Sequence, residues 1–306
     1  MPTLLNSAYS GDAITVDSII KDPTWLQERT YENLDGADLV KAIFRDGGTN
    51  DGVVAYREAA APYLNDDAEI VAEFAEIPTS GVNLGKVKKI VSERTAIGAR
   101  ISRDMVRKNK IDQVGLQVTA LQNTMVKNGV EGALRAFKAA DIQTLGATTK
   151  WEQSAAKPLR DIRNAKRMIS TAKAPNREDA LMGYRPDTLL LNEASLDLIL
   201  FNEEAQRYYN GSSPVDNPLY SGITPGVLAG LRVVVSAWLP DNEIYVLQSG
   251  VVGFESVVDP LTITPLYSEH GENGYGGSNQ SWRMDAFRER VLAVDNPKAA
   301  VKITGI

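Results

Sequence analysis

The longest regular pattern of apolar and polar positions lies between residues 102 and 140. Apolar residues recur there at steps of three and four, which places them on one face of a helix, and no proline interrupts the run. The apolar positions are Ile111, Val114, Val118, Leu121 and Met125, then, after a slip of one position, Val126, Val130, Leu134 and Phe137. We predict one helix of roughly 58 Å over 102–140, capped by Ser102. Two helices broken near Asn128-Gly129 are the alternative.

Residues 1–50 contain few positions that could form a core of their own. Residues 14–20 suit one short strand or helix, and Ala37 to Phe44 suit two helical turns that end at the sequence Arg45-Asp46-Gly47-Gly48. Isolated apolar residues come between them, namely Trp25, Leu26, Tyr31 and Leu34. This pattern fits a loosely packed segment, but it favours an arm that lies on another molecule.

Residues 51–100 predict a two-stranded excursion. Val53, Val54 and Tyr56 begin it, residues 68–77 alternate carboxylates with apolar groups, and residues 86–94 return as a strand after the turn-rich sequence 78–85. Such a hairpin buries too little apolar area to be stable alone. We therefore expect it to lie on a partner, within the chain or on a neighbour.

The segment 150–256 reads as a unit of mixed helices and strands. We expect a helix over 151–172 that starts again at Pro158, a buried strand over 186–191, and a helix that Asn192 caps and that continues to Tyr209 with Leu196, Ile199, Leu200 and Phe201 inward. Strands at 231–236 and 242–247 should pair with each other. Three later strands, at 261–267, 280–294 and 299–304, should pack against the long helix rather than join this unit.

Charge is segregated around the excursion. The carboxylates Asp66, Asp67, Glu69, Glu73 and Glu76 come first, and a basic run follows. That run consists of Lys86, Lys88, Lys89, Arg94, Arg100, Arg103, Arg107, Lys108 and Lys110. Cations in the first turns of a helix face an unfavourable macrodipole. Either the run is solvated, or a carboxylate-bearing segment covers it.

Composition narrows the function classes. The net charge of −6 over 306 residues argues against a strongly basic nucleic-acid binder, and the absence of cysteine excludes disulfides and thiolate sites and fits a reducing cytoplasm. No apolar run is long enough for a membrane span, and the N-terminus does not read as a secretory signal.

Catalytic chemistry is not visible in the sequence. His270 lies in a glycine-rich stretch without histidine or cysteine partners, and residues 274–278 lack the lysine of a phosphate loop. The pairs Asp66-Asp67 and Glu269/Glu272 lack the spacing of a calcium loop. We expect no enzyme activity, no cofactor and no metal.

Three stretches together resemble the major capsid proteins of tailed bacteriophages with the Hong Kong 97-type fold, in particular those of actinobacterial siphoviruses. They are ITVDSIIKDPTWLQERTYENLDGADLVKAIFRDGG at 14–48, GVVAYREAAAPYLNDDAEIVAEFAEIP at 52–78 running into KVKKIVSERTAIGARISRDMVRKNKI, and the C-terminal SWRMDAFRERVLAVDNPKAAVKITG. The resemblance spans nearly the whole chain. Each pattern is weak alone, and their order is the stronger signal.

The resemblance implies an α+β fold with an N-terminal arm, an extended loop, a peripheral domain and an axial domain. The arm would be 1–50 and the extended loop 51–98. The peripheral domain would be 99–148 with 257–306, including the spine helix, and the axial domain would be 149–256. Subunits of this family form hexamers and pentamers in an icosahedral shell around double-stranded DNA, which a shell of mild charge encloses without sequence-specific binding.

The resemblance also implies partners: other copies of the chain, a portal, a decoration protein and, since no scaffolding segment precedes the arm, a separate scaffolding protein if assembly needs one. The protein would reside in the virion capsid after assembly in the host cytoplasm. We expect subunit-interface residues at Glu69, Glu73 and Glu76 of one copy, over Arg103 and Arg107 of the next. Lys86, Lys88 and Lys89 belong to the same surface, and we expect none of them to form the isopeptide crosslink of some members.

Two other classes stay open. A bacterial nanocompartment shell that packages an enzyme shares the fold and differs in its contents. A cytoplasmic enzyme built on 150–256 would need a convergent polar pocket, which the missing histidines and cysteines make hard to assemble.

Overall fold

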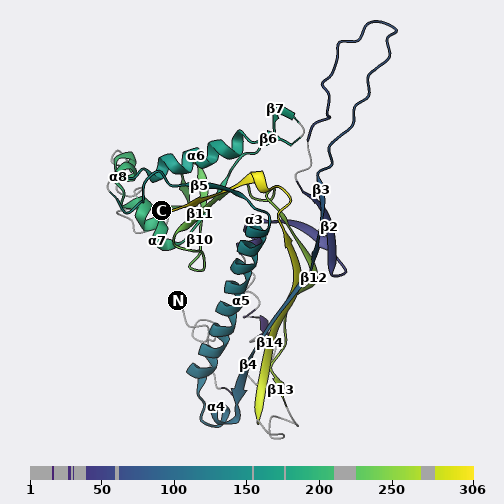
Figure 1. Ribbon diagram of the computed structural model, residues 1–306. Helices are drawn as coiled ribbons and strands as arrows, with labels where there is room; N and C mark the ends of the chain where they lie inside the picture. Colours follow the sequence, from purple (N-terminus) through teal and green to yellow (C-terminus); the bar gives the residue numbers. More distant parts are fainter. Residues whose placement is uncertain are drawn as a thin grey trace.

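The computed structural model describes residues 16, 27–28, 30, 39–58, 62–153, 155–175, 177–209, 225–269 and 280–306. An elongated part joins a long helix to a five-stranded sheet, an α/β part surrounds a six-stranded sheet, and a long loop projects from their junction (Figure 1). The predictions for Trp25, Leu26, Tyr31, Leu34, His270 and Glu272 lie outside the described residues.

The predicted long helix is two helices, α4 (Arg103–Arg107) and α5 (Ile111–Ala139). The prediction of one helix over 102–140 is therefore wrong at 108–110, where Asn109 adopts a left-handed φ of 49°. The amide of Lys110 donates to the carbonyl of Met105 (2.8 Å) and that of Asn109 to Val106 (3.1 Å), the paired bonds that end a helix. The alternative break near Asn128-Gly129 is also wrong, because α5 continues through these residues with Gly129 buried.

The slip in the apolar pattern of α5 marks a change of core. Val114, Val118, Leu121 and Met125 pack with Ile101 and with Trp282, Met284 and Ala286 of the five-stranded sheet. Val130, Ala133, Ala136 and Phe137 belong instead to the core of the α/β part, where Phe137 stacks on Phe44 and on Tyr245. One helix thus ties the two parts together.

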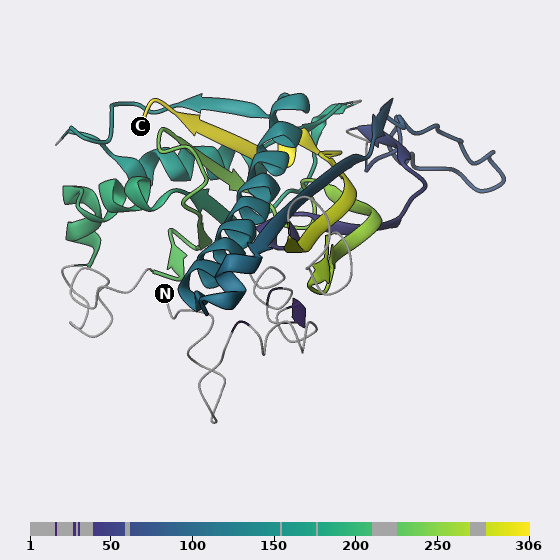
Figure 2. The same cartoon turned by 90° about the horizontal axis from the view of Figure 1, so that it is seen from below.

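The five-stranded sheet lies against α5, as Figure 2 also shows from below. Its strands are β1 (Arg45–Thr49), β4 (Glu93–Ser102), β12 (Phe254–Ile263), β13 (Tyr267–Ser268) and β14 (Ser281–Ala293). Strand β14 is central and pairs antiparallel with β4, β12 and β13. Its alternating burial confirms the two-faced strand predicted at 280–294.

The helix stop predicted at residues 45–48 is confirmed, and the same residues begin strand β1. After the short helix α3 (Leu39–Ile43), it runs parallel to β12. A Cβ at Gly47 would lie 2.7 Å from a ring carbon of Phe254. Gly47 therefore allows strand β1 to lie close to Phe254. From the sequence alone, a glycine with this role looks the same as a glycine that ends a helix.

The six-stranded sheet has the order β5-β15-β11-β8-β10-β9. The bounds are β5 Gln143–Gly146, β8 Thr188–Leu191, β9 Val227–Leu228, β10 Leu231–Val235, β11 Glu243–Leu247 and β15 Ala300–Thr304. The buried strand predicted at 186–191 is confirmed as β8. The pairing predicted between 231–236 and 242–247 is wrong, because β8, buried on both faces, lies between β10 and β11.

The last strand also differs from its prediction. Residues 299–304 were expected beside the long helix, yet β15 pairs with β11 and β5 inside the six-stranded sheet. Ala300, Val301 and Ile303 are fully buried. Such a strand is stable in the interior of a sheet that has other elements packed on both faces.

Helices α6 (Pro158–Ser170), α7 (Glu193–Leu200) and α8 (Glu203–Tyr209) complete the α/β part. Asn192 caps α7 as predicted, its side-chain oxygen accepting from the amide of Ala194 (3.1 Å). The continuous helix predicted to Tyr209 is wrong at Phe201 and Asn202, where Asn202 caps α8 through the amide of Glu204 (3.0 Å). Phe201, predicted to point inward, ends α7 and is 71% exposed.

The excursion is a hairpin at its base only. Strands β2 (Val53–Glu58) and β3 (Lys86–Val91) pair antiparallel, and Val54, Tyr56 and Ile90 pack against the cluster of Phe254. Residues 62–85, all described, contain no regular strand, so the strand predicted at 68–77 is wrong. The two arms of this loop are joined near its base by the bridge between Leu64 and Val82 and by the amide of Asn65, which donates to the carbonyl of Gly81 (2.9 Å). The hydroxyl of Ser80 also donates to the carboxylate of Asp66 (2.7 Å). A second small hairpin, β6 (Lys173–Ala174) with β7 (Arg177–Leu181), follows α6.

Candidate subunit interface

The tip of the extended loop exposes both its carboxylates and its apolar side chains. Glu69, Glu73 and Glu76 are all exposed, and no hydrogen bond or ion pair to them occurs within the described residues. Between them, Ile70 and Phe74 are essentially fully exposed and Ile77 is 78% exposed. Exposed apolar groups of this size mark surfaces that become covered on association.

The three lysines of the loop base differ in their surroundings. Lys88 pairs with Glu58 on the neighbouring strand (Nζ–Oε1 2.5 Å), while Lys86 and Lys89 are exposed. Lys89 lies opposite Ala55 on the hairpin face that also exposes Val53 and Val91. This face points away from the Phe254 cluster and is open to a neighbour.

Arg103 and Arg107 lie on the short helix α4, at the end of the molecule farthest from the loop. The guanidinium of Arg103 donates to the side chain of Gln280 (3.0 Å), and Arg107 approaches Asp104 (3.4 Å). Lys108 also donates to Asp104 (3.0 Å), which lowers the pKa of that carboxyl below its usual value. The predicted conflict with the helix dipole is wrong for Arg107, because α4 ends there and cations are favourable in a last turn.

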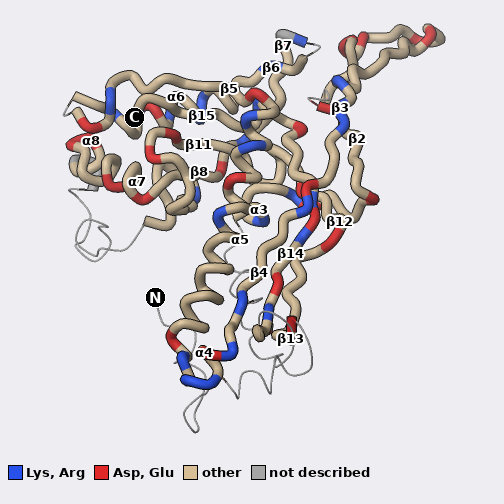
Figure 3. Tube along the Cα trace, turned by 60° about the horizontal axis from the view of Figure 1, so that its bottom comes forward, with Lys and Arg blue, Asp and Glu red and all other residues tan. Residues whose placement is uncertain are grey.

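The predicted partners do not meet within one chain. Figure 1 shows the loop extending from the top of the molecule and α4 at its lower end, and Figure 3 shows acidic positions at the loop tip and basic positions around α4. A fold of the loop back onto its own helix, the competing geometry, does not occur. Contact between these charges needs a second copy.

A contact that the sequence did not indicate holds the lower part of the loop. The hydroxyl of Tyr63 donates to the carbonyl of Leu181 (2.8 Å), and Arg177 bridges Asp67 (2.5 Å) and Asp179 (2.7 Å). Arg177 is largely buried, and its hydrogen bond lowers the pKa of Asp67. The loop is therefore tied to β7 below its tip. The acidic run in the sequence indicated that the loop makes a charged contact. The sequence did not indicate the partner, because Arg177 lies far along the chain.

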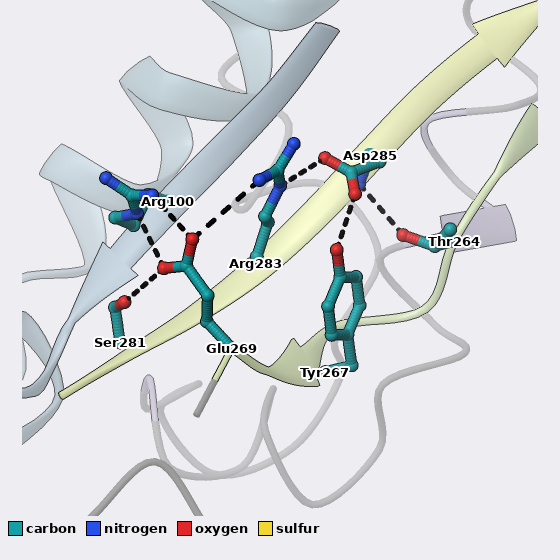
Figure 4. A network of polar contacts seen from close by, with 7 residues as sticks. All are labelled: Arg100, Thr264, Tyr267, Glu269, Ser281, Arg283 and Asp285. Carbon is teal, nitrogen blue, oxygen red and sulfur yellow. Dashed lines mark hydrogen bonds and ion pairs between the residues drawn. The ribbon is translucent and has the colours of Figure 1, made fainter. Parts of the chain in front are cut away.

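A polar network organises the sheet next to α4 (Figure 4). Glu269 accepts from the guanidinium of Arg100 (2.7 Å) and from the hydroxyl of Ser281 (2.6 Å), and these bonds lower the pKa of Glu269 to about 2. Arg283 links Glu269 to Asp285. Arg100 therefore pairs within its own chain, unlike the exposed Lys86 and Lys89 of the loop base.

Within the described part of the chain, no group of three or more carboxylate and histidine side chains could hold a metal ion. None of the described helices is both long and apolar enough to cross a membrane.

Several solved structures share the fold of this chain. The chain is similar to a virus-like particle from Pyrococcus furiosus (TM-score 0.59, 13% identity, covering 92% of this chain and 98% of that one). It is also similar to structures of Mycobacterium phage Bobi (0.57, 14%, 89% and 89%) and Mycobacterium phage Che8 (0.53, 14%, 97% and 93%). At these identities the likeness shows the fold alone. No curated protein sequence matches the chain.

The sequence profile of a family described as phage capsid protein matches residues 86–303. The match begins at strand β3 and ends in β15, so it includes the long helix, the strands of the six-stranded sheet and every strand of the five-stranded sheet except β1. It covers well over half of the chain, and the α+β architecture agrees with the Hong Kong 97-type fold expected from the sequence. The chain belongs to the phage capsid protein family.

Proposed function

We propose that this chain is the major capsid protein of a tailed bacteriophage, assembling as hexamers and pentamers into an icosahedral shell around double-stranded DNA. The family match over 86–303 carries the proposal. The projecting loop supports it, because Ile70, Phe74 and Ile77 have no cover within the described chain. The role is structural, and the shell encloses DNA without reading its sequence.

The loop tip is the proposed contact between subunits. Glu69, Glu73 and Glu76 of one copy lie over Arg103 and Arg107 of a neighbour, and Lys86, Lys88 and Lys89 contribute to the same interface. The separation of the two groups at opposite ends of one chain supports a contact between copies. Each exposed ion pair contributes only about 0.2–1 kcal/mol, but a shell repeats the contact in every subunit.

The domain division and the remaining partners are part of the proposal. We propose an arm at 1–50, a loop at 51–98, a peripheral domain at 99–148 with 257–306 and an axial domain at 149–256. Strands β5 and β15 of the peripheral segments pair within the sheet of the axial domain. A portal, a decoration protein and a scaffolding protein would complete the virion, assembled in the host cytoplasm.

A shell that packages an enzyme is the second candidate, because a virus-like particle from Pyrococcus furiosus shares the fold. Negative-stain microscopy of the purified chain tests both, since each predicts closed shells or capsomer rings. Nuclease-treated particles from phage-producing cells then separate them: double-stranded DNA inside supports the capsid, and a protein cargo without DNA supports the compartment. A chain that stays monomeric at all concentrations would overturn both.

A further inference from the structure

The outward face of α6 carries a row of exposed arginines. Arg160, Arg163 and Arg167 follow one another at helical spacing and are exposed, while Ile162 and Ile169 on the opposite face are fully buried. Helix α6 packs through that buried face on β15 and β11. No carboxylate of the described chain forms an ion pair with these three guanidinium groups. We call them the α6 row.

A groove of complementary chemistry lies at the turn between α7 and α8. Its volume is about 340 Å³, and its lining includes Trp151, Glu152, Asp197, Leu198, Phe201 and Glu203. The ring of Phe201 is 71% exposed, and the carboxylates of Glu152 and Asp197 are exposed beside it. An aromatic face next to carboxylates suits an arginine side chain, whose planar guanidinium stacks on a ring and pairs with carboxylates.

The two surfaces do not satisfy each other within one chain. No residue of α6 lines the groove, and Figure 3 shows acidic positions along α7 and α8. A chain with two different complementary patches makes head-to-tail contacts, and such contacts close into a ring when the rotation between copies permits. A nucleic-acid phosphate backbone would account for the α6 row but leave the acidic groove unexplained.

We propose that the α6 row of one subunit docks in the α7–α8 groove of the next copy, so that these contacts circle the centre of each capsomer. This inference rests on the proposed self-assembly and adds to it a second contact, distant from the loop. The guanidinium of an α6 arginine lies over Phe201 and pairs with Asp197 or Glu152 of the neighbour.

Disulfide trapping tests the docking directly, because the chain contains no cysteine. We expect assembled Arg163→Cys/Asp197→Cys protein, after mild oxidation, to give a ladder of crosslinked species up to the full capsomer ring. Each single variant should give dimers at most. A matched control, Arg163→Cys/Glu131→Cys, places the second cysteine at an exposed position of α5 and should give no ladder.

Charge reversal supplies an independent readout. Arg163→Glu/Arg167→Glu should lower shell yield at least about tenfold, since attraction becomes repulsion at every copy of the contact. Adding Glu152→Arg and Asp197→Arg should recover most of that loss, with circular dichroism showing each subunit folded. No recovery in the quadruple variant would overturn the docking.

The outcomes separate this inference from the proposed function. Shells of the unaltered chain without crosslinks between positions 163 and 197 overturn the docking and leave the capsid role standing. Shells that form in normal yield from Arg163→Glu/Arg167→Glu protein but package less nucleic acid overturn it in favour of a phosphate contact. An unaltered chain that forms neither rings nor shells overturns both.

Discussion

At the scale of single residues, the distance from a glycine to neighbouring backbone atoms decides whether a larger residue can replace it. Gly253 is buried at the start of β12, and a Cβ there would lie 2.3 Å from the carbonyl oxygen of Ala293 and 2.8 Å from the ring of Phe44. The carbonyl oxygen of Ala293 belongs to β14, whose backbone is paired with β12, so this oxygen cannot move aside. Gly146 at the end of β5 has no atom within 4 Å of the same position.

We therefore expect Gly253→Ala to destabilise the subunit by about 3 kcal/mol, the upper range for overpacking. Gly146→Ala is the matched control and should change the free energy of unfolding by less than about 1 kcal/mol. Urea denaturation of the unassembled subunit measures both. Equal values for the two variants would refute the close contact at Gly253.

Glu269 makes acid stability a second prediction at this scale. Hydrogen bonds from Arg100 and Ser281 lower its pKa from 4.5 to about 2. A depressed carboxyl pKa contributes stability above pH 4.5 that is lost as the pH falls toward 2. The thermal midpoint should fall over this window, and Glu269→Gln should make that fall shallower. Glu76→Gln, at an exposed position of the loop tip, serves as control, and an identical slope in both variants would count against the network.

At the scale of elements, the loop tip and the loop base have separate roles. The base, β2 with β3, packs on Phe254 through Val54, Tyr56 and Ile90, whereas residues 68–79 touch little else. A deletion of residues 66–94 would remove β3 and the first residues of β4. Such a deletion should unfold part of the sheet.

Replacing residues 68–79 by a short Gly-Ser bridge is the sharper experiment. It keeps the Leu64–Val82 bridge and the Asp67–Arg177 ion pair. We expect a thermal midpoint within about 2 °C of the unaltered subunit, because little apolar area is buried there, and no closed shells by electron microscopy. Normal shells from this variant would show that the tip is dispensable.

At the scale of the whole molecule, segregated charge should make assembly sensitive to salt. The Debye length falls from about 10 Å at 0.1 M to about 3 Å at 1 M, so assembly followed by light scattering should weaken over that range. Arg103→Glu/Arg107→Glu should block assembly of a folded subunit, and adding Glu69→Lys and Glu73→Lys should restore part of it. If the fourfold variant assembles no better than the twofold one, the loop does not cover α4.

What the sequence by itself determined are the features that depend on short-range periodicity and local caps. The long amphipathic helix, the buried strand β8, the two-faced strand β14 and the Asn192 cap all follow from spacing over a few residues. The slip at Val126 was visible too, although only the structure explains it as a change of core. The order of the patterns also carried the resemblance to the capsid family.

Only the tertiary structure decided what depends on distant partners. The sequence around Asn109 resembles an ordinary helix interior, and at the break the side chain of Asn109 accepts from the amide of the distant Val16 (2.9 Å). The pairing of β15 with β11 and the tie between Arg177 and Asp67 join segments far apart along the chain. Strand order follows from which strands are buried on both faces, and that depends on all layers packing at once. The proposed contact between the α6 row and the α7–α8 groove likewise depends on the packed fold, because only the fold shows that both surfaces are exposed.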